Sequence, residues 1–274
     1  MKTFTSYGFA ILTVIMSCCI SCQQHKSLSS SCKQEKQQVD REGHLFDEAD
    51  KPACHIVLDI STIKELNDER LKDTLNSLFI SHALGDEYTV ISPEEAVNNF
   101  ANHYIKQYRE EIEPLYIKET SNEDIQDVSA WFQYYLGIHT DIERFNDRFL
   151  VYNILKESYT GGAHGMYTSS YLNIDLQGPK LLHIYDVIKK TEKGVVTELI
   201  WKYLALQEDV TTRQELEELG YGFGNDIEPS EIFILGEDSL TFVYNPYDIA
   251  PYSMGKIHVS IPLTELKPFL QLNL

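Results

Sequence analysis

The residues best suited to chemistry lie in a glycine-rich stretch, Tyr159-Thr-Gly-Gly-Ala-His-Gly165. Its three glycines permit positive φ angles and close backbone approach, as a tight hairpin or an anion-binding nest requires. His164 could act as a general base or metal ligand, and a hydrolase would pair it with a carboxylate such as Asp175. No second histidine or carboxylate stands at a recognisable ligand spacing, which favours a hairpin whose histidine caps backbone groups. The candidate binding residues here are Tyr159, Gly161, Gly162 and His164.

A second unusual segment is Tyr244-Asn-Pro-Tyr-Asp-Ile-Ala-Pro-Tyr-Ser-Met-Gly255. Two prolines stiffen it, and its tyrosines offer large amphipathic surfaces with few rotatable bonds. Such a loop is suited to binding, with Tyr247 and Tyr252 as the contact residues. In the alternative interpretation, the tyrosines fill a gap between two subdomains. The sequence leaves both interpretations open.

The usual catalytic signatures are missing from the sequence. There is no His-Glu-x-x-His, Gly-x-Ser-x-Gly, Walker loop or Gly-x-Gly-x-x-Gly. Gly220-Tyr-Gly-Phe-Gly224 precedes an acidic stretch that would repel phosphate, so we interpret it as the end of a helix. A calcium site at Asn225, Asp226 and Glu228 would lack the alternating acidic loop with its glycine. We expect a binding protein rather than an enzyme, with no metal and no cofactor.

The charge balance restricts the partners. The 274 residues carry 42 acidic and 23 basic side chains, a net charge of −19. This excess of carboxylates repels nucleic acid and attracts basic proteins or cations. Nucleic-acid binding is therefore excluded as a function class.

The N-terminus is typical of a secretory signal. Lys2 precedes an apolar stretch, and Ser-Cys-Cys-Ile-Ser-Cys follows it. Cys18 or Cys22 could be the lipidated residue of a bacterial lipoprotein, carrying palmitate among its acyl chains. A cleaved signal without lipid is the alternative. We expect residues 1–22 to direct the protein to the cell envelope, where a lipid anchor holds it facing the periplasm.

A polar, Ser/Gln/Lys-rich segment follows, and its composition predicts a flexible tether over residues 23–52. Cys32 lies in this segment, and Cys54 lies just beyond it. An oxidising compartment permits a disulfide between them, but nothing in their spacing demands one. Their pairing stays open.

The remaining chain predicts an α+β fold with helices packed on antiparallel sheets in two closely associated subdomains, residues 53–178 and 179–274. Apolar spacing indicates a helix over 63–84, and Ser92-Pro93-Glu94-Glu95 begins another. A period of two then predicts strands. A strand is expected at 54–61, before the first helix. The expected later elements are strands at 130–139, 149–155, 167–176, 231–235, 239–244 and 256–261, a helix at 194–207, and a short helix after Pro262.

Two of these segments resemble known extracytoplasmic modules. Tyr159-Thr-Gly-Gly-Ala-His164, with the following Tyr171–Leu176 and Leu182–Ile188, is similar to the junction of a PdaC-type N-terminal module with an RsiV-like module. The tyrosine- and proline-containing loop and Val259-Ser-Ile-Pro-Leu263 resemble the RsiV-like signature. The resemblance covers about residues 53–270.

The resemblance implies an envelope protein whose best-understood relative binds lysozyme. That relative also has a cytoplasmic anti-sigma segment, and the deacetylases have a separate catalytic domain; we expect neither here. The partners implied are a basic hydrolase such as lysozyme, or peptidoglycan fragments. A peptidoglycan- or glycan-acting hydrolase, or its accessory module, is the alternative.

Overall fold

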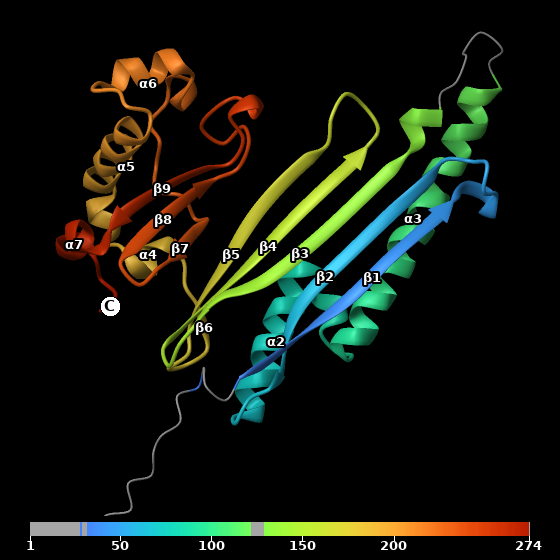
Figure 1. The fold of residues 1–274 in the computed structure, drawn as a ribbon, viewed down its shortest axis with the longest axis horizontal. Coiled ribbons are helices and arrows are strands. Elements are labelled where there is room, and N and C mark those ends of the chain that lie inside the picture. The colour runs from blue at the N-terminus through green and yellow to red at the C-terminus, as the bar shows by residue number, and fades with distance from the viewer. Residues whose placement is uncertain (1–27, 29–31, 122–128, 274) are drawn as a thin grey trace, which may run out of the picture.

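The computed structural model describes residues 28, 32–121 and 129–273. It contains a six-stranded sheet and a three-stranded sheet, with helices packed on both (Figure 1). The α+β prediction is confirmed, including antiparallel pairing for most strands. The candidate lipid cysteines, Cys18 and Cys22, lie outside the described residues.

The larger sheet has the strand order β1-β2-β3-β4-β5-β6. Its strands are β1 (Lys33–His44), β2 (Ala53–Glu65), β3 (Tyr134–Phe145), β4 (Phe149–Thr160), β5 (Met166–Asp175) and β6 (Lys180–Leu181). Only the β2–β3 pair is parallel among these described strands. Two helices connect β2 to β3, which is the crossover that parallel neighbours require.

These two helices cover one face of the larger sheet (Figure 1). The first, α2 (Glu69–Ala83), begins at Asp68, whose carboxylate accepts the Leu71 amide. The second, α3 (Pro93–Thr120), begins with the expected capping box between Ser92 and Glu95. The predicted helix start at residue 63 is wrong, because Ile63 still pairs with β1 as part of β2.

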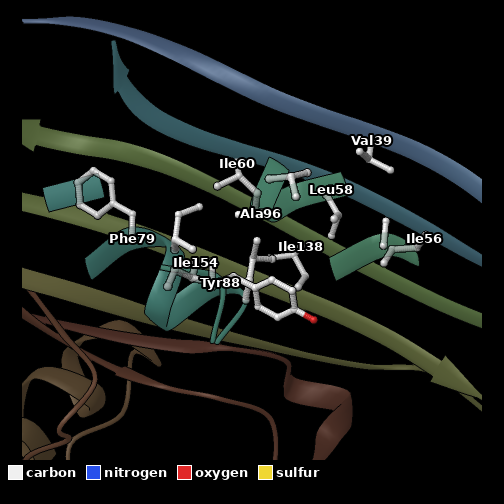
Figure 2. Packing of buried hydrophobic residues seen from close by; sticks show 14 of the residues in the cluster. Val39, Ile56, Leu58, Ile60, Phe79, Tyr88, Ala96, Ile138 and Ile154 are labelled. Atoms are coloured by element: carbon white, nitrogen blue, oxygen red, sulfur yellow. The ribbon is translucent and has the colours of Figure 1, made fainter. Parts of the chain in front are cut away.

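The core between this face and the helices is apolar. Ile56, Leu58 and Ile60 alternate along β2 and are fully buried, as Figure 2 shows. Phe79 of α2 stacks on Tyr152 of β4 with ring centroids 3.9 Å apart. Stacked rings add to the stabilisation that comes from burying their area.

The segment expected to be a tether is largely a strand. β1 pairs with β2 along its whole length and buries Val39 against the core. Its composition is polar because it is an edge strand, and charged side chains on an edge discourage pairing with other molecules. The tether prediction is therefore wrong for Lys33–His44. Cys32 and Cys54 are both free thiols, the second buried in β2.

The smaller sheet has the order β7-β8-β9 and a core of its own. Its elements and the associated helices are α4 (Ile184–Val187), α5 (Lys193–Gln207), α6 (Arg213–Leu219), β7 (Phe233–Leu235), β8 (Ser239–Tyr244), β9 (Ile257–Pro262) and α7 (Leu263–Leu266). Short 3-10 helices lie at Leu45–Asp47, Asp86–Tyr88, Ser129–Phe132, Lys190–Glu192, Gly222–Gly224, Tyr252–Met254 and Lys267–Phe269.

The two sheets are joined by buried and partly buried hydrogen bonds. The Asn173 side chain on β5 donates to the Phe233 carbonyl at 2.6 Å and accepts from the Leu235 amide at 2.8 Å. Arg144 donates to the carbonyls of Leu235 and Gly236, both at 2.6 Å. These contacts fix the position of the smaller sheet against β3 and β5 of the larger one.

None of the helices formed by residues 28, 32–121 and 129–273 combines the length and apolar content needed to cross a bilayer.

Candidate functional site

The two loops singled out in the sequence meet in the structure. His164, in the hairpin between β4 and β5, stacks on Tyr252, with ring centroids 4.4 Å apart and planes at 25°. The Tyr252 hydroxyl donates to the Gly165 carbonyl at 2.8 Å. His164 and Tyr252 are 88 positions apart in the sequence, and only the packing of the smaller sheet beside β5 brings them together.

Two further tyrosines extend this contact. Tyr247 lies 5.6 Å from Tyr252 and Tyr167 lies 6.2 Å from it, measured between ring centroids. We call the group formed by His164, Tyr167, Tyr247 and Tyr252 the tyrosine–histidine surface. Tyr167 was not among the predicted binding residues, although its place directly after the glycine-rich hairpin was a usable signal.

Tyr247 and His164 are both exposed members of this surface. The exposed fraction of Tyr247 is 52%, and its φ is 74°. A left-handed conformation is unfavourable for a bulky residue unless its surroundings enforce it. Here the Tyr247 amide donates to the Ala250 carbonyl at 3.2 Å. The backbone therefore holds a large ring outward into solvent.

The loop that carries Tyr247 is anchored to β5 by Asn245. Its side chain accepts from the Ser169 amide at 2.7 Å and donates to the Ser169 carbonyl at 3.1 Å. The Asn245 amide in turn donates to Asp248 at 2.7 Å. Side-chain bonds to the backbone on both sides reduce the freedom of the loop, so little entropy remains to be lost on binding.

Lys256 bonds the same β5 residue, Ser169, that anchors the loop through Asn245. Its ammonium donates to the Ser169 hydroxyl at 2.8 Å. Burial lowers the pKa of Lys256, while the nearby Glu143 carboxylate acts in the opposite direction. The Lys256 amine therefore forms part of the contact between β5 and the segment that precedes β9.

The hairpin itself depends on its glycines. Gly161 has φ 82°, and a Cβ there would lie 2.3 Å from the Trp131 carbonyl oxygen. Tyr159 donates to the Gly162 carbonyl at 2.9 Å and closes the turn. Trp131, with an exposed fraction of 59%, lies in a 3-10 turn rather than in the predicted strand, since β3 begins only at Tyr134.

The hydrolase pair is not assembled. Nδ1 of His164 lies 2.9 Å from the Gly165 carbonyl oxygen, in the hairpin just before β5. Asp175 ends the same strand, 3.8 Å from Arg148, and accepts from the Gln177 amide. About ten residues of extended chain span roughly 30 Å. The prediction that these two residues could act together is therefore wrong.

The described residues also hold no group of three or more His, Cys, Asp or Glu side chains arranged to bind a metal ion.

Comparison with known proteins identifies two matching families. Residues 48–167 match the family described as Deacetylase PdaC, and residues 185–264 match the protein family of unknown function DUF3298. A comparison with curated proteins finds no match.

Two solved structures are similar along most of the chain. A DUF3298 family member from Bacteroides fragilis NCTC 9343 is 38% identical, with a TM-score of 0.84, covering 88% of this chain and 94% of the other. A DUF3298 family protein from Pseudomonas aeruginosa PAO1 is 14% identical, with a TM-score of 0.59, covering 89% and 96%. The second likeness concerns the fold alone.

Proposed function

The chain belongs to the DUF3298 family of proteins of unknown function, and from that premise we propose that it binds a basic protein, such as a lysozyme, through the tyrosine–histidine surface. The two family matches together suggest an envelope-associated protein. The observation that carries the proposal is the convergence of His164, Tyr247 and Tyr252 from two loops on separate sheets. Rigid aromatic anchors of this kind dominate the binding energy of protein interfaces.

Charge supports a basic partner. The net charge of −19 accelerates encounter with a cationic protein, and that contribution weakens as salt is added. The tyrosines supply a salt-resistant contribution through buried area. The resemblance to RsiV-like modules, whose best-understood relative binds lysozyme, points to the same class of partner.

The direction of the strands places the tyrosine–histidine surface at the end of the larger sheet opposite to the N-terminal end of β1. Lys33 begins β1 at one end of the larger sheet, and the hairpin that carries His164 lies at the other end (Figure 1). We propose that a lipid on Cys18 or Cys22 holds the chain at the membrane. Cys18→Ser and Cys22→Ser variants should differ in membrane retention. If both variants remain at the membrane, the result contradicts the proposed lipid anchor.

The decisive experiment is calorimetric titration of the full chain with a basic lysozyme at about 0.15 M and about 0.3 M salt. Tyr247→Ala should weaken binding about tenfold, the loss expected for an interface aromatic. Leu206→Ala removes an apolar side chain that is 66% exposed on α5 and should change nothing. Absence of saturable heat would contradict the proposal and make peptidoglycan fragments the next ligand to test.

A further inference from the structure

The larger sheet has a second face that the helices do not cover. Along β2, residues facing α2 and α3 are buried, whereas the alternating residues His55, Val57 and Asp59 are partly exposed. The neighbouring Asp40 and Glu42 of β1 are exposed on the same side. The smaller sheet covers part of this face: Val151 of β4 and Tyr171 of β5 pack with Val243, and Arg144 of β3 bonds the carbonyls of Leu235 and Gly236.

A glycine lies at the centre of the uncovered part. Gly137 of β3 is flanked by Val57 on β2 and Glu157 on β4. A Cβ at this position would lie 2.6 Å from the Tyr135 hydroxyl and 3.3 Å from Nε2 of His139. The phenol of Tyr135 therefore occupies the space that a side chain at 137 would fill. Glycine inside a strand often marks a place where another group approaches the backbone closely.

Two carboxylates flank the Tyr135 ring, and each contacts a histidine. His55 lies edge-on to the ring with centroids 5.8 Å apart, and its Nε2 is 2.6 Å from Asp40. His139 lies 3.7 Å from Glu157. Burial raises the pKa of Tyr135, and the charges of Glu157 and Asp40 raise it further, which agrees with both carboxylates lying close to the ring.

Unlike Asp59 and Asp141, these two carboxylates contact histidines and have no lysine or arginine partner among the described residues. The Lys36 ammonium pairs with Asp59 at 3.0 Å and with Asp141 at 3.1 Å on the same face. Within the described part of the chain, no lysine or arginine lies within 4.0 Å of Asp40 or Glu157. We call this group the Tyr135 shelf. Its members are Asp40, His55, Tyr135, Gly137, His139 and Glu157.

We propose that the Tyr135 shelf binds the guanidinium or ammonium group of an arginine or lysine side chain on the partner protein. The cation lies over the Tyr135 ring, where the negative face of the π-system attracts it, and pairs with Glu157. This inference rests on the proposed function for the identity of the partner. It adds a second contact region with its own chemistry.

Continuity with the first surface supports the assignment. Glu157 pairs across β4 and β5 with Tyr167, and Tyr167 in turn lies 6.2 Å from Tyr252. One partner can therefore contact both regions. The tyrosine–histidine surface supplies aromatic area, and the Tyr135 shelf supplies the complementary negative charge.

The test uses a hexa-arginine peptide titrated into the full chain at about 0.05 M salt, with a hexa-citrulline peptide as the uncharged probe of the same shape. Glu157→Gln and Gly137→Ala should each weaken hexa-arginine about fivefold to tenfold. The alanine acts by displacing Tyr135, since its Cβ would overlap the hydroxyl. Glu110→Gln on α3, across the sheet, makes the same charge change as Glu157→Gln and should have no effect.

The outcomes separate the two proposals. Equal loss in Glu157→Gln and Glu110→Gln, or equal binding of both peptides, would overturn the Tyr135 shelf as a cation site. Lysozyme binding that depends on Tyr247 but not on Glu157 or Gly137 would overturn it while the proposed function stands. Hexa-arginine binding that depends on Glu157 and Gly137, without any lysozyme binding, would support the shelf and contradict the proposed function. Thermal melting of each variant verifies that it is folded.

Discussion

At the scale of single residues, the glycines of the hairpin have different physical reasons for being glycine. Gly161 and Gly162 both have positive φ, at 82° and 104°. Only Gly161 also lies against a neighbouring backbone, the Trp131 carbonyl, whereas no atom lies within 4 Å of a Cβ at Gly162. Gly162 therefore tests the effect of the positive φ alone, and Gly161 tests it together with the close contact to the Trp131 carbonyl.

We expect Gly162→Ala to lower the free energy of unfolding by about 1 kcal/mol, the cost of a left-handed alanine. Gly161→Ala should cost about 2 kcal/mol more, because the Trp131 carbonyl must also move. Urea unfolding of the two variants side by side measures the difference. Equal costs would mean that the contact with Trp131 does not constrain the hairpin.

A half-buried histidine predicts that the stability of the chain depends on pH. Burial lowers the pKa of His258 from 6.5, and the charge of Lys256 lowers it further. The unfolded chain therefore binds more protons in the window between this lowered pKa and 6.5, so stability rises with pH across that window. None of the described residues forms a hydrogen bond with the buried Nε2 of His258.

His258→Gln should flatten the rise in unfolding free energy between about pH 5 and pH 7. Urea midpoints measured at half-unit pH intervals give the slope. His82→Gln, on the exposed side of α2, is the control for losing an imidazole elsewhere. An unchanged slope in His258→Gln would show that this histidine does not couple stability to pH.

At the scale of elements, β1 explains why a polar segment is ordered. Its backbone satisfies the hydrogen bonds of β2, and only Val39 and Gly43 of its residues are buried. Gly43 fits against Ile105 of α3, where a Cβ would lie 2.3 Å from a methyl carbon. Backbone pairing and one close helix contact, rather than an apolar pattern, hold this strand.

A fragment that begins at Gly43 should accordingly be less stable than the chain from Gln23. Losing β1 leaves β2 as an unprotected edge beside an apolar core, which favours aggregation. We expect a fall in melting temperature of about 10 °C or more, with larger species in size-exclusion chromatography. Equal melting temperatures would indicate that β1 contributes little.

At the scale of the whole molecule, the junction between the sheets creates the candidate site. Asn173 is 1% exposed and bridges β5 to β7 through two hydrogen bonds. This bridge and the Arg144 contacts hold the smaller sheet so that its tyrosine-containing loop lies beside the hairpin. We therefore expect binding by the tyrosine–histidine surface to depend on the Asn173 hydrogen bonds, which lie near the opposite end of β5.

Asn173→Ala should lower the unfolding free energy by about 2–4 kcal/mol, because it leaves the Phe233 carbonyl and the Leu235 amide buried without partners. It should also weaken lysozyme binding by separating the two loops. Asn225→Ala, at an exposed position, is the matched control and should change neither quantity. Denaturant unfolding and calorimetry together measure both, and a stable Asn173→Ala chain would contradict the role of this bridge.

The sequence by itself determined the class of fold, the capped start of α3, the strand Ser239–Tyr244 and the two loops worth examining. These features depend on local periodicity, capping and turn chemistry, which neighbouring residues encode. It did not disclose β1, because an edge strand stabilised by backbone pairing has no apolar pattern to detect.

Only the tertiary structure decided which candidates meet. His164 was brought to Tyr252 rather than to Asp175 because strand direction separates the ends of β5 while the junction of the sheets joins distant loops. The Tyr135 shelf likewise required the lateral register of four strands, since Asp40, His55, Gly137 and Glu157 have no common spacing in the chain. Register and junction are long-range properties, and no local pattern of residues specifies them.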